Sequence, residues 1–118
     1  MGLRDLGKKL RATPDELDDQ RLQLRFGELG ATPINEAVAR RPIKISGEIT
    51  RVMIAPRNGV PALEIMIDDG TGTCTAVFTG RRAIGGMAHG RAVVLEGVAH
   101  EEHGRRIILN PNYTLLPH

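Results

Sequence analysis

The sequence is poor in aromatic residues and in cysteine, and both shortages limit the sites it can build. Its 118 residues include two phenylalanines, one tyrosine and no tryptophan, so any ligand surface made of stacked aromatic rings must be poor. Cys74 is the single cysteine. One cysteine forms neither an intramolecular disulfide nor a cysteine-based zinc site, and the simplest compartment for such a chain is a reducing one.

Long apolar runs are also missing. No uninterrupted apolar stretch reaches the roughly 18 residues needed to span a bilayer. The N-terminal MGLRDLGKKL lacks the apolar core of a secretory signal, and Leu6 stands where a myristoylation pattern requires serine or threonine. We therefore expect a cytoplasmic protein that does not bind membranes.

A strong charge of either sign is absent as well. The formal net charge is +2 at pH 7. Acidic and basic residues balance over residues 1–40, so the whole excess lies in residues 41–118. A charge this small does not by itself indicate a nucleic-acid ligand.

The first part of the chain has a helical period. Thr13–Glu16, TPDE, is typical of a helix start, with a hydroxyl cap and a proline in the first turn. Gly30 and the following residues 31–33, ATP, predict the end of the helical region. The apolar residues on helical faces are Leu3, Leu6, Leu10, Leu22, Phe26 and Leu29.

Two interpretations of this N-terminal arm, residues 1–32, remain open. It is either a partly ordered tail or lid packed on the main domain, or a basic amphipathic segment that grips a partner. The equal number of acidic residues argues against a membrane surface as that partner.

From Arg41 onward the apolar period changes to two, which is typical of half-buried strands. Five strands are predicted: residues 43–54, 63–67, 74–78 and 92–99, and a fifth that begins at 107. In the first, the apolar register shifts from odd positions to even ones between Ile49 and Val52. Such a shift requires a bulge that lets one long strand serve both halves of a barrel. Residues 56–61, PRNGVP, predict a loop.

The segment Ile67–Cys74, IDDGTGTC, has the composition of a metal loop, a phosphate cradle or a tight turn. A phosphate loop requires Gly-Lys-Ser/Thr before a helix, whereas a strand follows here. A calcium loop requires further acidic ligands at alternate positions, and these stop at Asp69. Gly70 and Gly72 supply the positive φ angles of a tight hairpin. The segment therefore predicts a turn.

No pattern indicates catalysis, a metal or a cofactor. The segment His100–His103, HEEH, would bring two imidazoles together on a helix, but it lies between two strands and has no evident third ligand. Cys74 has apolar strand neighbours, where an inert thiol is expected. No Ser-His-Asp order, nucleotide fingerprint or nucleophile elbow occurs. We predict that the chain is not an enzyme.

Four segments, taken in order, resemble an OB-fold nucleic-acid-binding domain: ISGEITRV (45–52), IDDGTGTCTAVF (67–78), GRAVVLEGVA (90–99) and NPNYTLL (110–116). The sequence is similar to the OB domain of the wedge region of RecG-type helicases and to small actinobacterial proteins that consist of such a domain alone. PINEA (33–37) resembles the lead-in to that domain.

The resemblance covers residues 33–116 and implies a mainly β fold, a five-stranded OB-fold barrel preceded by a short α-helical N-terminal arm. No motor domain accompanies it, so helicase activity is not implied. The connector at 79–90 is short, which predicts that the usual capping helix is reduced to a turn.

The resemblance further implies binding of single-stranded or branched nucleic acid across strands two and three, between the loops after strands one and four. DNA is the expected ligand, with RNA as an open alternative. The residues expected at this surface are Arg51, Arg57, Asn58, Thr75, Phe78, Arg81, Arg82, Arg105 and Arg106.

Each of these assignments has a plainer alternative. The arginines would contact phosphates, or they are ordinary solvated loop residues. Phe78 would stack on a base, or it fills the core. Glu64 and Asp68 on the outer face of strand two would repel phosphates, so we expect weak binding with little sequence preference.

Two functions follow. The first is a stand-alone OB-fold module that binds nucleic acid in DNA repair or recombination. The second is a protein-interaction adaptor that uses the barrel and the N-terminal arm, which the acidic floor and the scarcity of aromatics favour.

Overall fold

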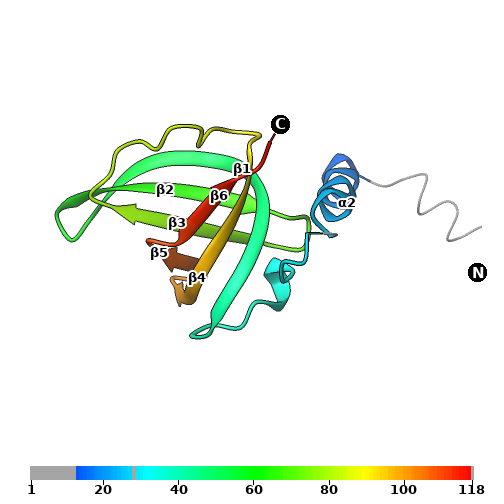
Figure 1. The fold of residues 1–118 in the computed structure, drawn as a ribbon, viewed down its shortest axis with the longest axis horizontal. Coiled ribbons are helices and arrows are strands. Elements are labelled where there is room, and N and C mark those ends of the chain that lie inside the picture. The colour runs from blue at the N-terminus through cyan, green and yellow to red at the C-terminus, as the bar shows by residue number, and fades with distance from the viewer. Residues whose placement is uncertain (1–12, 28, 118) are drawn as a thin grey trace, which may run out of the picture.

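The computed structural model describes residues 13–27 and 29–117, in which a helix precedes a β-barrel (Figure 1). The predictions for Leu3, Leu6 and Leu10 lie outside these residues. The elements are α2 (Pro14–Phe26), the 3-10 helix η1 (Ile34–Glu36), β1 (Pro42–Arg57), β2 (Val60–Asp68), β3 (Thr73–Thr79), β4 (Ala92–Glu102), β5 (Arg105–Leu109) and β6 (Asn112–Leu115). No helix in the described part of the chain is long and apolar enough to cross a membrane.

Five strands close the barrel. β1 pairs antiparallel with β2 and β4, and β2 pairs antiparallel with β3. β3 runs parallel to β5, and β5 pairs antiparallel with β4, which completes the ring. This topology confirms the predicted five-stranded barrel. The predicted fifth strand is divided into β5 and β6 at Asn110, whose φ of 48° turns the chain before Pro111.

The predicted bulge in β1 is confirmed. The pairing register with β2 shifts between Ile49 and Arg51. Before the shift β1 pairs with β4 through residues 42–48, and from Glu48 onward it pairs with β2. Gly47 allows the close approach at this bend, because a Cβ there would lie 2.9 Å from the carbonyl oxygen of Asp68. One strand therefore serves both halves of the barrel.

The loop predicted at residues 56–61 is wrong. β1 ends at Arg57 and β2 begins at Val60, so only Asn58 and Gly59 form the turn, with φ of 50° and 77°. Two residues with positive φ form the tight turn that suits strand twist. Pro56 and Pro61 are register partners; a pair that exchanges no hydrogen bonds tolerates two prolines. The result is a long hairpin instead of a loop.

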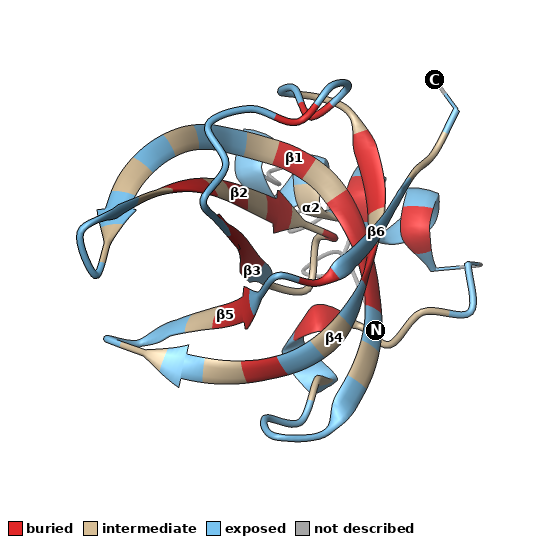
Figure 2. Cartoon of the chain, turned by 60° about the vertical axis from the view of Figure 1, so that its left-hand side comes forward, coloured by how far each residue is buried: buried red, intermediate tan, exposed pale blue. Residues whose placement is uncertain are grey.

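The barrel core consists mainly of aliphatic side chains. Leu63, Ile65 and Ile67 alternate inward along β2 as predicted, each no more than 2% exposed. Ile84 and Met87 of the connector between β3 and β4 join the same core. The described residues 80–91 contain no helix, so two apolar side chains take the place of the capping helix. Figure 2 shows the buried positions along the strands.

α2 begins where the sequence predicts. The Oγ1 atom of Thr13 accepts a hydrogen bond from the backbone N–H of Glu16 at 3.2 Å. The helix ends at Phe26, earlier than the predicted stop at Gly30. Leu22 and Phe26 are buried in a cluster with Ala92 of β4, and the chain leaves the helix once these contacts are made.

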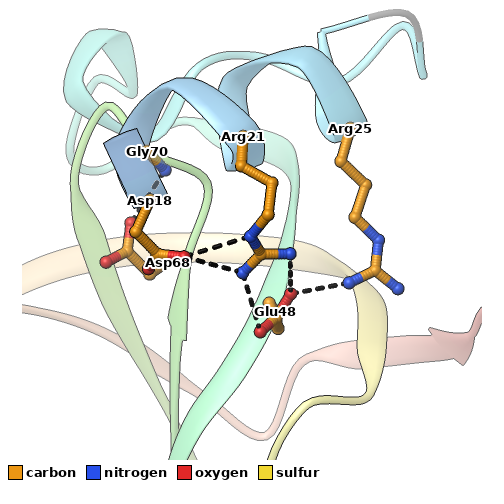
Figure 3. A network of polar contacts seen from close by, with 6 residues as sticks. All are labelled: Asp18, Arg21, Arg25, Glu48, Asp68 and Gly70. Atoms are coloured by element: carbon orange, nitrogen blue, oxygen red, sulfur yellow. Dashed lines mark hydrogen bonds and ion pairs between the residues drawn. The ribbon is translucent and has the colours of Figure 1, made fainter. Parts of the chain in front are cut away.

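Polar contacts also hold α2 on the barrel (Figure 3). The Glu48 carboxylate accepts hydrogen bonds from Arg21 at 3.1 and 3.2 Å and from Arg25 at 2.6 Å. Gln23 Nε2 donates to the carbonyl oxygen of Gly70 at 2.8 Å. The described part of the arm therefore packs against the barrel.

Candidate nucleic-acid interface

The Asp-Asp-Gly-Thr-Gly turn uses its buried carboxylate internally. The carboxylate of Asp69 accepts hydrogen bonds from the backbone N–H groups of Ile34 at 2.9 Å, Thr71 at 2.9 Å and Gly72 at 3.2 Å. It also accepts one from the Thr71 hydroxyl at 2.6 Å. These bonds close the turn between β2 and β3 and attach η1 to it. The predicted turn is confirmed, but of its two glycines only Gly70 has a positive φ, of 87°, so the prediction of a positive φ at Gly72 is wrong.

A groove lies on the outer face of β2 and β3, between the β1–β2 and β4–β5 hairpins. The two hairpins extend on the same side of the barrel (Figure 2). It consists of two adjoining hollows of about 200 and 80 Å³ that share Met66, Thr75 and Arg105. We call it the β2–β3 groove. Of the predicted residues, it is lined by Arg51, Thr75, Arg105 and Arg106.

Strand register explains why these side chains meet. Met66 of β2 is the register partner of Arg51 on β1 and of Thr75 on β3. Paired residues on neighbouring antiparallel strands point to the same face of a sheet. Arg51, Met66 and Thr75 therefore form a row across three strands, and the β4–β5 hairpin adds Arg105 and Arg106 beside it.

A clasp of three side chains joins the two hairpins. Arg57, at the end of β1, forms an ion pair with Glu102, at the end of β4. The Nε2 atom of His100 lies 2.9 Å from the same carboxylate. The Arg57 guanidinium, and after it the His100 ring, lower the pKa of Glu102 to about 2. Glu102 therefore stays ionised and holds Arg57, and none of the three clasp residues lines either hollow of the groove.

The three arginines that line the groove differ in their partners. Arg105 Nη1 lies 3.2 Å from the Glu64 carboxylate on β2. Arg51 and Arg106 form no ion pair or side-chain hydrogen bond with any other described residue. Glu101 adds one more acid to the lining. The groove thus offers the free guanidinium groups of Arg51 and Arg106, whereas Glu64 neutralises that of Arg105.

Besides Phe78, four predicted residues line neither hollow of the groove, and Arg57 of the clasp is one of them. Asn58 forms the tip of the β1–β2 hairpin, with φ of 50°. Arg81 lines a different hollow, beside Tyr113. Arg82 is exposed on the connector between β3 and β4 and lines neither hollow of the groove. The arginines after β3 therefore do not join those of the hairpins at this groove.

Phe78 is a correction to the predicted surface. It is only 5% exposed and belongs to the barrel core. Its ring packs nearly perpendicular to that of Tyr113, with centroids 5.7 Å apart. Phe78 faces inward because it lies on the same face of β3 as the buried Cys74 and Ala76. It fills the core and offers no free face to a base.

Sequence reasoning missed several groove residues. Met53 lines the groove from beyond the bulge in β1. The clasp residues His100 and Glu102, beside the groove, belong to the HEEH segment, for which the sequence predicts no metal site. Among the described residues no three histidine, cysteine, aspartate or glutamate side chains are placed to hold a metal ion. Cys74 is buried, and burial raises the pKa of its thiol to about 11, so it is an inert core residue.

Comparison with protein-family models and with curated proteins gives no match. Among solved structures, the chain is similar to the S. pombe Stn1–Ten1 complex, with a TM-score of 0.53 and 23% identity over 64% of this chain and 58% of that one. A replication protein A heterotrimer bound to ssDNA matches with a TM-score of 0.51 and 13% identity, over 76% of this chain and 75% of that one. The chain has the OB fold.

At these identities the likeness establishes the fold alone. This OB-fold chain spans less than two thirds of the matched chain in the Stn1–Ten1 complex. Neither structure is a RecG-type helicase, so the likeness to the wedge domain stays a prediction.

Proposed function

We propose that this OB-fold chain binds single-stranded or branched nucleic acid along the β2–β3 groove, with DNA as the expected ligand. The observation that carries the proposal is the convergence of Arg51, Arg105 and Arg106 from separate strands onto one groove. Guanidinium groups that reach a common groove suit a phosphate backbone. A similar fold occurs in a replication protein A heterotrimer bound to ssDNA, which supports the same class of ligand.

Binding at this groove is weak and has little sequence preference. Glu64 and Glu101 lie beside the cations, and no aromatic residue lines either hollow in the described part of the chain. Affinity then comes from phosphate contacts, for which dissociation constants on the order of 1 to 100 µM are typical. The proposed setting is DNA repair or recombination in the cytoplasm, in line with the resemblance to wedge domains.

Fluorescence anisotropy with labelled single strands and forks tests this function. Replacing Arg51 or Arg106 by glutamine should weaken binding and lower the slope of log K against log salt by about 0.7 for each lost phosphate contact. Arg82→Gln is the matched control, because it removes the same charge outside the groove. No binding at low salt, or equal binding by all three variants, would overturn the proposal.

The adaptor function is the alternative, and the outer face of α2 favours it. Leu17 and Leu24 are 54% and 83% exposed, and their spacing of seven residues places them on the same helical face. Leu22 and Phe26 are already buried against the barrel, so this second apolar face has no partner within the described chain.

Pull-down after nuclease treatment separates the two functions. Replacing both Leu17 and Leu24 by aspartate should release a protein partner without disturbing the buried face of α2. A partner that resists nuclease and is lost in this variant supports the adaptor. A partner lost on nuclease treatment supports nucleic-acid binding.

A further inference from the structure

A second hollow lies near the other end of β3 from the groove. Its volume is about 350 Å³, and the residues that line it are Phe78, Arg81, Asn110, Pro111, Asn112 and Tyr113. We call it the Tyr113 hollow. It is formed by the end of β3, the start of the connector, the turn between β5 and β6, and the start of β6. Its volume is at the lower end of the range of small-molecule sites, large enough for one nucleotide base.

The hollow contains the one aromatic side chain that is open to a ligand. The three aromatic residues of the sequence all lie in the described part of the chain, where Phe26 and Phe78 are each 5% exposed and Tyr113 is 39% exposed. The Phe78 ring packs at 86° to the Tyr113 ring, which fixes the orientation of Tyr113. A held and exposed aromatic ring is the feature on which unpaired bases stack.

Polar groups surround this ring. Arg81 is exposed and forms no ion pair or side-chain hydrogen bond with another described residue. The Asn110 side chain is fixed, because it accepts a hydrogen bond from the Thr79 backbone N–H at 3.0 Å and donates one to the Thr79 hydroxyl at 3.1 Å. Its amide nitrogen retains a second hydrogen for a ligand, and Asn112 supplies another amide.

We propose that the Tyr113 hollow binds one nucleotide, with its base stacked on Tyr113, its phosphate on Arg81 and its base edge near Asn110. This inference rests on the proposed function, since the nucleotide belongs to a strand that also lies in the β2–β3 groove; a free nucleotide offers the same chemistry. Thr75 and Phe78 are three residues apart on β3, about 10 Å along it, and their side chains point to opposite faces of the sheet, so a nucleic-acid strand that reaches both sites must pass over the edge of the barrel. The hollow supplies the base contact that the groove lacks.

Tyrosine fluorescence reports on this hollow directly, because Tyr113 is the only tyrosine and the chain has no tryptophan. Titration with an oligothymidylate strand and with thymidine monophosphate, corrected for ligand absorbance, should quench the emission to saturation. In anisotropy, Tyr113→Ala should weaken binding of the strand on the order of 10- to 100-fold, and Tyr113→Phe should retain most of it.

A surface variant guards against loss of packing in Tyr113→Ala. Arg81→Gln should weaken strand binding and lower the salt slope by about 0.7, whereas Arg82→Gln, the neighbouring exposed arginine, should leave both unchanged.

The outcomes separate this inference from the proposed function. If Arg51→Gln and Arg106→Gln weaken binding of the strand but Tyr113→Ala and Arg81→Gln do not, the nucleotide site in the hollow is overturned. The proposed binding at the groove is then kept. Quenching by the mononucleotide without strand binding supports the hollow and overturns the proposed function. Quenching by the strand alone supports the hollow and identifies the strand as the source of its nucleotide. No quenching by either ligand overturns the hollow.

Discussion

Arg57 at the end of β1 and Glu102 at the end of β4 form an ion pair that links the hairpins on either side of the β2–β3 groove. His100 contacts the same carboxylate, and it is the register partner of Ile107 on β5. Ile107 packs in a small cluster with Ala62 and Val77 that is separate from the barrel core, so the clasp lies on the outer face of the barrel. Arg57 lines neither hollow of the groove, so a phosphate bound between the two hairpins would reach it only in competition with Glu102. The clasp therefore limits the charge available to a ligand.

Replacing Glu102 by glutamine should strengthen nucleic-acid binding. The variant removes one negative charge beside the groove and frees Arg57 for a phosphate. Exposed charge interactions are worth up to about 1 kcal/mol, so we expect an affinity gain of about 2- to 5-fold at low salt that shrinks as salt rises. Glu36→Gln, an exposed glutamate on η1, is the charge-matched control. Equal anisotropy curves for the two variants would contradict a role for the clasp.

The same carboxylate should shape stability in acid. Its pKa is lowered from 4.5 to about 2 in the folded chain. A group with a lowered folded pKa contributes stability above its unfolded pKa and loses that contribution as pH falls through the folded value. The wild-type chain should therefore lose more stability between pH 4.5 and 2 than Glu102→Gln. Urea unfolding across this range measures it, and parallel curves for the two proteins would refute it.

Asp69 should be worth more to the fold than its neighbour Asp68. Asp69 is buried and accepts four hydrogen bonds in the β2–β3 turn, whereas Asp68 accepts one backbone hydrogen bond, from the Gly70 N–H. Unpaired buried donors cost about 1 to 3 kcal/mol each. We expect Asp69→Ala to lower the free energy of unfolding by about 2 to 5 kcal/mol and Asp68→Ala by about 1 kcal/mol. Similar losses in chemical denaturation would show that the turn does not depend on Asp69.

Local patterns predict the barrel better than its hairpins. The alternation of Leu63, Ile65 and Ile67 and the register shift after Ile49 are visible in the sequence because burial repeats every second residue. The sequence predicts a loop in place of the β1–β2 hairpin because two prolines flank Asn-Gly. Their positions in a ladder depend on which partner pairs exchange hydrogen bonds, and pairing is a property of the fold.

The candidate site shows the same division. Phe78 shares one face of β3 with Cys74 and Ala76, so its burial could have been predicted from the sequence of β3 alone. The clasp could not, because Arg57 and Glu102 are 45 residues apart in the chain and meet only when β1 and β4 lie in one closed barrel. The sequence also does not show that Arg57 forms an ion pair whereas Arg51 forms none with the other described residues.

The contact between α2 and the β2–β3 turn yields the last prediction. Gly70 has a φ of +87°, and a Cβ there would lie 2.1 Å from the carbonyl oxygen of Asp19 and 2.8 Å from Cγ of Gln23, both on α2. Gly80 has a similar φ of +75° with nothing within 4 Å of the added Cβ. Alanine at either position has the backbone cost of a positive φ, about 1 kcal/mol, but only alanine at position 70 must displace the helix.

Gly70→Ala should therefore lower the free energy of unfolding by about 2 to 4 kcal/mol, the sum of backbone strain and lost helix contacts, and Gly80→Ala by about 1 kcal/mol. Trypsin should cleave Gly70→Ala after Arg21 and Arg25 faster than it cleaves the wild type, because release of α2 frees both arginines from Glu48. Gly80→Ala should keep the wild-type cleavage rate at these two sites. Equal stability losses together with equal cleavage rates would mean that α2 does not depend on its close approach to Gly70.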